Sequence, residues 1–83
     1  MDFTNGTIIT VKNKRYIIIE TIVYENKNYI FTNEIKGEEE LTEDYYIFQT
    51  VDNNVILITN EEKLNKLLEQ FQEKLKKTID EFL

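Results

Sequence analysis

The chain of 83 residues contains no cysteine, histidine, proline or tryptophan, and it also lacks alanine and serine. Without cysteine and histidine there is no disulfide framework, thiolate nucleophile, imidazole base or Cys/His metal site. Only two glycines are present, and neither belongs to a phosphate-binding motif. From these absences we expect no enzymatic activity, no cofactor and no bound metal.

Long apolar runs are missing as well. No segment approaches the roughly 18 consecutive apolar residues that a membrane helix needs. The N-terminal stretch has no basic region of the kind that begins a secretion signal, and the lack of cysteine suits a reducing compartment. We therefore expect a cytoplasmic protein that does not bind a membrane.

The clearest pattern lies at the C-terminal end, where apolar residues recur at spacings of three and four. This pattern predicts one amphipathic helix over residues 60–82, with Thr59 or Asn60 as its N-cap. Leu68 and Phe71 are central on the apolar stripe and are expected to be buried against a sheet. The full stripe consists of Leu64, Leu68, Phe71, Leu75, Ile79 and Phe82, widened by Leu67 and Leu83.

Five β-branched and aromatic segments precede this helix between residues 6 and 58, separated by short turns. The expected strands cover residues 7–11, 15–24, 29–35, 44–51 and 55–58. Because parallel strands need long crossovers, these short turns predict an antiparallel meander. We therefore expect one α+β domain over residues 1–83: a five-stranded antiparallel meander followed by one long C-terminal amphipathic helix packed on one sheet face.

The segment 15–24 is the longest of these strand candidates, and it is apolar on both faces. Alternation directs Tyr16, Ile18, Ile22 and Tyr24 to one face, together with Glu20. A strand with two apolar faces is expected at the centre of the sheet.

The net charge is −6, and the acidic excess is concentrated between residues 34 and 44. Residues 36–43 are expected to form a glycine-containing loop, and their sequence lacks the alternating ligands of a calcium site. Two interpretations stay open, a solvated loop and an acidic surface that faces a basic partner. The candidate partner-binding residues are Glu38, Glu39, Glu40, Glu43 and Asp44.

The chain has five tyrosines, and one helix can cover only one face of a sheet. The other face is therefore expected to be open and aromatic, with Tyr16, Tyr29 and Tyr46 as candidate partner-binding residues. The alternative is that these tyrosines are half-buried strand residues, since tyrosine favours strands. The acidic balance has the wrong sign for direct nucleic-acid binding, so the expected partner is a protein.

The helix is expected to be longer than the sheet that it covers. About 22 residues span roughly 33 Å, whereas strands of about five to seven residues span roughly 17–24 Å. Ile79, Phe82 and Leu83 are therefore expected beyond the covered face, where they fray, fold over the open end of the sheet, or join two copies in a homodimer.

Three stretches carry a resemblance to a known family: YIIIETIVYENKNYIF, DYYIFQTVDNNVILIT after an acidic spacer, and EEKLNKLLEQFQEKL. In this pattern the chain resembles the small acidic YrzB-like proteins of low-GC Gram-positive bacteria. The resemblance implies a strand-rich domain with a closing helix and a family without an assigned function. It implies no catalytic residue.

Together these features predict a non-enzymatic acidic module that binds a protein with a basic surface. Its sharpest form is a phage or mobile-element inhibitor that blocks a basic nucleic-acid-handling host protein, as an anti-CRISPR or similar counter-defence protein does. The alternative is a housekeeping structural or regulatory homodimer of YrzB-like type, joined through the helix end.

Overall fold

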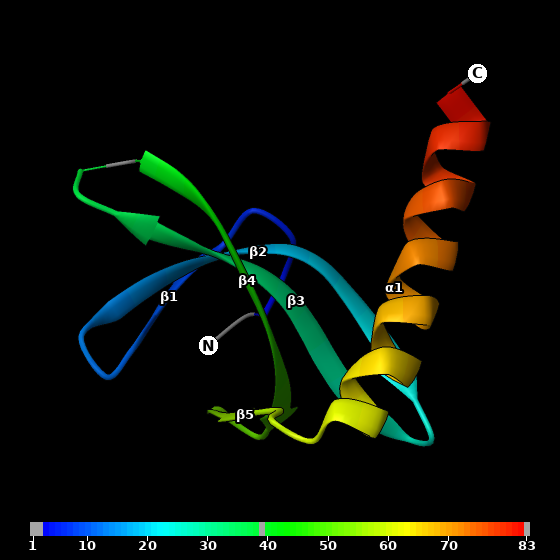
Figure 1. Ribbon diagram of the computed structural model, residues 1–83, viewed down its shortest axis with the longest axis horizontal. Coiled ribbons are helices and arrows are strands. Elements are labelled where there is room, and N and C mark those ends of the chain that lie inside the picture. Colours follow the sequence, from blue (N-terminus) through cyan, green and yellow to red (C-terminus); the bar gives the residue numbers. More distant parts are fainter. Residues whose placement is uncertain (1–2, 39, 83) are drawn as a thin grey trace.

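The computed structural model describes residues 3–38 and 40–82, and it describes side chains as far as residue 77. It contains one antiparallel sheet of five strands in the order β1-β2-β3-β4-β5, followed by one helix (Figure 1). The elements are β1 (Ile8–Val11), β2 (Lys14–Tyr24), β3 (Lys27–Lys36), β4 (Glu40–Val51), β5 (Asn54–Leu57) and α1 (Glu61–Phe82). The predicted meander with a C-terminal helix is confirmed.

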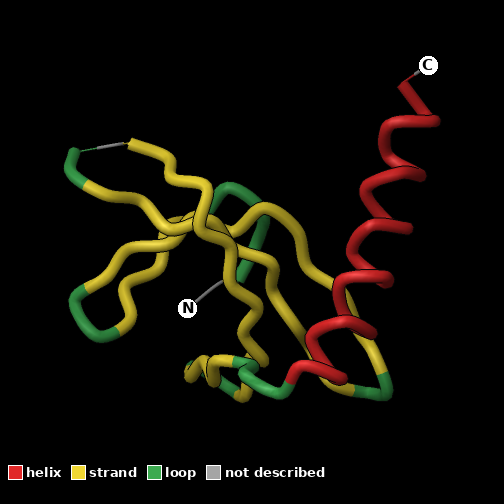
Figure 2. The backbone as a smooth tube through the Cα atoms, viewed as in Figure 1, coloured by secondary structure: helices red, strands yellow, loops and turns green. Residues whose placement is uncertain are grey.

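Tight turns join the strands, as the tube in Figure 2 shows. Two of them, Lys12–Asn13 and Glu25–Asn26, have positive φ at both central residues. This is the geometry of the type I′ hairpin turn, whose twist matches that of the flanking strands. In each turn an asparagine occupies the second position, where its side chain tolerates the left-handed conformation.

Glu25→Asn is expected to raise the free energy of unfolding by a few tenths to about 1 kcal/mol. Glu25 has a φ of 50°, and asparagine adopts this left-handed conformation at a smaller cost than glutamate. Urea denaturation measures the change. Lys27→Asn is the control, because Lys27 lies in β3 just after the turn. An equal gain at Lys27 would contradict the explanation.

A β-bulge divides β2 into two parts. Ile18 pairs with Thr32, but Glu20 pairs with Phe31, so the register shifts at Ile19. An extra residue in one strand reverses which face the following side chains occupy. The prediction that Tyr16, Ile18, Ile22 and Tyr24 share one face is therefore wrong.

The two parts of β2 contribute to two separate cores. The inner core is made of Ile9, Tyr16, Ile18, Ile30 and Phe48, with Phe3, Val11, Tyr46 and Val55 packed against it. Side chains from both edge strands meet in this cluster, which means that the sheet curls around it. The helix core is made of Tyr29, Ile47, Ile58, Leu67 and Phe71, with Ile22, Tyr24, Phe31, Leu64 and Leu68 packed against it.

The hairpin of β3 and β4 is longer than predicted. The segment 36–43 was expected to be a loop, but β3 runs to Lys36 and β4 begins at Glu40. A register irregularity follows, since Asn33 pairs with Tyr45 and Ile35 with Leu41. The buried Asn33 amide donates hydrogen bonds to the carbonyls of Thr42 at 2.6 Å and Asp44 at 3.1 Å. These bonds satisfy two backbone carbonyls of β4 at the irregularity.

Asn60 caps the helix: its side-chain oxygen accepts a hydrogen bond from the Lys63 amide at 3.0 Å. Leu67 and Phe71 are 0% and 1% exposed, whereas Leu68 is only half-buried. The predicted burial is thus correct for Phe71 and wrong for Leu68. The reason is that α1 leans on β2, where Lys74 contacts Glu20 and Thr21. In this orientation of α1, Leu67 faces the sheet and Leu68 lies on the flank of the helix.

No helix in the described part of the chain is long and apolar enough to cross a membrane.

Candidate functional site

An apolar groove lies between the first turns of α1 and the strands β4 and β5. Its volume is about 550 Å³. It is lined by Phe31, Tyr45, Tyr46, Ile47, Leu57, Ile58, Thr59, Leu64 and Leu68. All of these except Thr59 are aliphatic or aromatic, so the groove suits an apolar side chain.

The groove follows from the unequal lengths of β4 and β5. β5 pairs with β4 only from Asn54 to Leu57, opposite Val51 to Phe48. The chain then leaves the sheet to begin α1, so β5 provides no neighbour for the earlier part of β4. Leu64 and Leu68 form the opposite wall, because they lie on the flank of α1 that faces away from Lys74. At 100° per residue these two leucines lie about 80° or more around the helix from Lys74.

Apolar side chains remain exposed around this groove. Tyr45 is 54% exposed, Ile56 52% and Leu57 45%. Tyr45 leans on Phe31, with ring centroids 5.4 Å apart. Tyr45 and Leu57, which both line the groove, therefore leave apolar surface exposed to solvent there.

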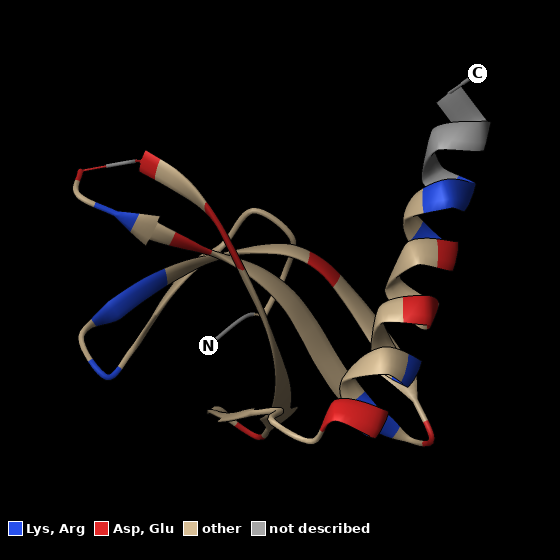
Figure 3. Ribbon diagram, in the orientation of Figure 1, with Lys and Arg blue, Asp and Glu red and all other residues tan. Residues whose placement is uncertain are grey.

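The candidate acidic residues of β4 lie at the start of the strand, before the residues that line the groove. Figure 3 shows them along the β3–β4 hairpin, next to the basic residues of the β1–β2 hairpin. Glu34 lies within 3.9 Å of Lys14 and 3.8 Å of Lys36, and Asp44 lies 3.7 Å from Lys36. Lys14 and Lys36 therefore offset part of the acidic excess between residues 34 and 44.

Three of the candidate acids differ from Asp44 in their surroundings. Glu38, Glu40 and Glu43 are exposed, and within the described residues no ion pair involves them. Glu40 and Glu43 lie in β4 itself, and Glu43 and Asp44 directly precede Tyr45. The candidate Glu39 lies outside the described residues.

The candidate tyrosines do not form one open face. Tyr16 belongs to the inner core and is 7% exposed, whereas Tyr29 belongs to the helix core and is 1% exposed. Tyr46 is half-buried and packs edge-on against Tyr16, with centroids 5.5 Å apart. The curl of the sheet closes the face that was expected to stay open.

Glu34 is a buried acidic residue next to Tyr16 of the inner core. Glu34 is 4% exposed and faces the same side of the sheet as Tyr16, with which it pairs across β2 and β3. Burial raises the pKa of the Tyr16 hydroxyl, and the charge of Glu34 and the neighbouring Tyr46 raise it further. Tyr16 therefore stays protonated as a structural residue.

Ile79, Phe82 and Leu83 are the residues proposed for self-association. The side chains of Ile79 and Phe82, and all of Leu83, lie outside the described residues. The homodimer through the helix end therefore stays a prediction.

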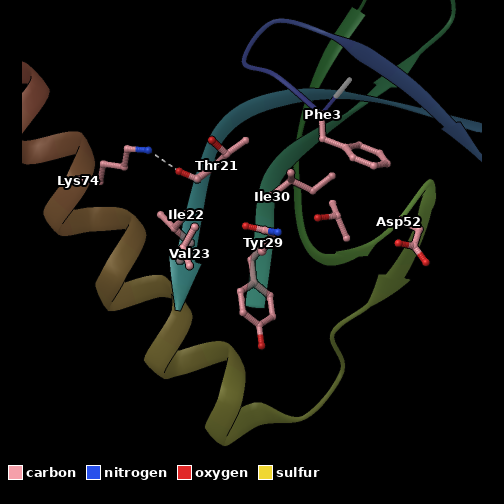
Figure 4. Close-up of a pocket in the computed structure, with 10 residues that line it drawn as sticks. Phe3, Thr21, Ile22, Val23, Tyr29, Ile30, Asp52 and Lys74 are labelled. Atoms are coloured by element: carbon pink, nitrogen blue, oxygen red, sulfur yellow. Dashed lines mark hydrogen bonds between the residues drawn. The ribbon is translucent and has the colours of Figure 1, made fainter. Parts of the chain in front are cut away.

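A second hollow of about 540 Å³ lies beside β2 and β3 (Figure 4). Lys74 and Asp52 lie on opposite sides of it. The Lys74 ammonium lies 3.1 Å from the Glu20 carboxylate and donates a hydrogen bond to the Thr21 carbonyl. Because these contacts engage the Lys74 ammonium in holding α1 against β2, Lys74 is less suited to bind a ligand. This hollow is therefore the weaker candidate for a binding site.

Glu20 follows the β-bulge and faces α1. Burial alone raises the pKa of this carboxyl, but hydrogen bonds from the Thr21 amide, the Asn5 amide group and Lys74 outweigh burial. The net pKa lies below its ordinary value of 4.5. Glu20 is therefore an ionised anchor for the helix, and it is not poised as a general acid at neutral pH.

Among the side chains that the structure describes, no group of three or more acidic residues is arranged to hold a metal ion. The groove itself contributes no carboxylate and no amine among its lining residues. Its chemistry is that of apolar contact.

Sequence reasoning missed the groove residues Tyr45, Leu57 and Leu64. One signal was present for the helix: Leu64, Leu67 and Leu68 make the apolar stripe wider than a single buried line requires. A signal for Tyr45 was its position directly after Glu43 and Asp44. No sequence pattern indicated Leu57, because its exposure depends on where β5 ends.

Comparison with known proteins gives no match: no protein-family model fits the chain, and neither a curated protein nor a solved structure is significantly similar to it.

Proposed function

We propose that this chain is a non-enzymatic module that binds a protein partner through an apolar groove with an acidic border. The observation that carries the proposal is the position of Tyr45. This exposed side chain lines the groove and directly follows the acidic residues of β4. A partner that inserts an apolar side chain here brings its neighbouring residues close to Glu43.

The exposed carboxylates favour a partner with a basic surface. Glu38, Glu40 and Glu43 extend the negative charge from the groove to the tip of the β3–β4 hairpin. Charges at the border of an interface mainly accelerate association and select the partner, while the apolar centre supplies affinity. The two parts of the surface therefore have different roles.

The sharpest form of the proposal is an inhibitor, encoded by a phage or mobile element and acting in the cytoplasm, that occupies the nucleic-acid groove of a basic host protein. Carboxylates at the hairpin tip can take the place of phosphates in such a groove, and the module itself binds no nucleic acid. Lys14 and Lys36 restrict the negative surface to the hairpin tip and β4, so the inhibitor covers a short part of the basic groove.

The test is affinity capture from a lysate of a low-GC Gram-positive bacterium, with identification of the bound protein by mass spectrometry. The wild type is compared with a triple variant, Glu38→Gln, Glu40→Gln and Glu43→Gln. The expected result is one basic nucleic-acid-handling protein that the wild type retains. Purified, it should associate with the triple variant about tenfold more slowly at low salt, and salt should reduce the wild-type rate similarly.

The matched control is the triple variant Glu25→Gln, Glu69→Gln and Glu73→Gln, which removes the same charge from exposed positions outside the hairpin. It should associate at nearly the wild-type rate. Equal slowing in both variants would mean that only the net charge matters. Absence of any protein that the wild type and this control retain more strongly than the Glu38, Glu40 and Glu43 variant would contradict the proposal.

A further inference from the structure

One edge of β4 is open beside the groove. β4 spans Glu40–Val51, but β5 covers it only from Phe48 onwards, with one further hydrogen bond from the Ile58 amide to the Ile47 carbonyl at 3.0 Å. In the described residues no strand pairs with this side of β4 between Glu40 and Tyr46. Figure 1 shows this part of β4 rising past the end of β5.

The backbone direction along this open edge is fixed by two observations. The Ile47 carbonyl faces β5, so the backbone groups of Tyr45 and Glu43 face the same side by alternation. In agreement, the carbonyls of Thr42 and Asp44 face β3, because both accept hydrogen bonds from Asn33. Glu43 and Tyr45 therefore direct their amides and carbonyls to the open side.

The groove is continuous with this edge. Tyr45 and Tyr46 belong to opposite faces of β4, yet both line the groove, so the groove wraps around the strand edge at these residues. An extended segment that pairs with β4 at Glu43 and Tyr45 thus leads directly to the cavity. Its end side chain would contact Leu57, Leu64 and Leu68.

The charges around the open edge of β4 indicate which kind of segment can bind there. The open edge carries Glu40, Glu43 and Asp44, and the first turn of α1 beyond Thr59 carries Glu61 and Glu62. Lys63 is directed elsewhere, with its ammonium 5.4 Å from the centre of the Tyr29 ring, outside the groove. A second copy would bring the same acidic strand against itself, and opposed like charges destabilise such a pair. A basic segment has the complementary charge.

From these observations we infer that β4 binds an extended, lysine- or arginine-containing segment of the partner as an added strand, with one apolar side chain of that segment in the groove. This inference rests on the proposed function and specifies how the partner is held. Strand addition gives affinity through main-chain hydrogen bonds and specificity through the side-chain pocket. The acidic border keeps the open edge from pairing with other copies of the chain.

The probe is a short synthetic peptide of alternating valine and lysine with a leucine at one end, prepared with the leucine at either end. Amide hydrogen exchange and NMR titration report where it binds. The amides of Glu43 and Tyr45 should gain protection, whereas the Tyr46 amide, which faces β3, serves as an internal reference. A version with glutamate in place of lysine should bind at least about tenfold more weakly at low salt.

Two further arms test the pairing and the pocket. N-methylation of alternate peptide amides removes the strand hydrogen bonds and should reduce binding about tenfold or more. Tyr45→Ala, at a 54% exposed position, should weaken binding about tenfold. Val23→Ala, at a 72% exposed position on β2, should leave it unchanged. Thermal melts of both variants verify that the fold persists.

Four results would overturn the inference: no peptide binding, equal binding of the lysine and glutamate peptides, full binding of the N-methylated peptide, or self-association of the protein through this edge. The captured partner separates this inference from the proposed function. If that partner depends on the hairpin carboxylates but is neither displaced by the peptide nor weakened by Tyr45→Ala, the strand inference fails and the proposed function stands. If the peptide binds to β4 but no partner is captured, the proposed function fails and the strand inference stands.

Discussion

Replacing Leu67 with alanine is expected to lower the free energy of unfolding by about 2–5 kcal/mol, the range for a buried leucine truncated in a tight core. Leu67 is 0% exposed and packs with Phe71, Tyr29, Ile47 and Ile58 in the helix core. Small domains have a total stability of about 5–15 kcal/mol, so this change removes a large fraction of it. Urea denaturation followed by circular dichroism gives the value.

Two controls separate the loss of packing from other effects. Leu67→Met nearly conserves volume and should cost less than about 1.5 kcal/mol. Leu68→Ala should cost clearly less than Leu67→Ala, because Leu68 is half-buried and faces the groove. If Leu68→Ala proves the more destabilising substitution, the orientation of α1 on the sheet is wrong.

Lys74→Met is expected to lower the free energy of unfolding by about 1–2 kcal/mol at neutral pH, between the values typical of an exposed ion pair and of a hydrogen bond to a charged group. The Lys74 side chain is 47% exposed, which screens the interaction, but its partner Glu20 is only 9% exposed. The substitution leaves that carboxylate without its cation. Lys76→Met, on the exposed face of α1, is the matched control and should have little effect.

The cost of Lys74→Met should depend on pH. The pKa of Glu20 is lowered in the folded protein from its ordinary value of 4.5. A group with a lowered folded pKa contributes stability that is present above its unfolded pKa and is lost as the pH falls through the folded pKa. The difference between wild type and Lys74→Met should therefore be constant near neutral pH and shrink below pH 4.5.

Part of that difference should remain in acid, since the hydrogen bond from Lys74 to the Thr21 carbonyl does not require an ionised Glu20. Denaturation of both proteins over a range of pH gives the curve. A difference that grows on acidification would show that Glu20 does not act as the anchor of α1.

The anchor and the groove are connected through the orientation of the helix. Lys74 draws α1 toward β2, and this rotation leaves Leu64 and Leu68 on a neighbouring flank, where they line the groove. The contact between Glu20 and Lys74 thus helps to shape a surface on the neighbouring flank of the same helix. In this fold the stability of the helix core and the geometry of the groove depend on one orientation.

The sequence by itself determined the order and type of the elements. Local properties carry this information: β-branched alternation between tight turns gives the strands, asparagine at left-handed positions gives the turns, and spacings of three and four give α1. The acidic residues near the groove were also evident from the chain. Each of these features depends on residues that are close together along the chain.

Only the tertiary structure decided which side chains are buried and which remain open. The bulge at Ile19 reverses the faces of β2 and separates Tyr16 from Ile22, and the curl of the sheet encloses Tyr16 while α1 covers Tyr29. One extra residue in a strand shifts every later side chain to the other face, and no local propensity encodes it. The groove at Tyr45 likewise depends on where β5 ends and how α1 is rotated, which are set by packing between residues far apart in the chain.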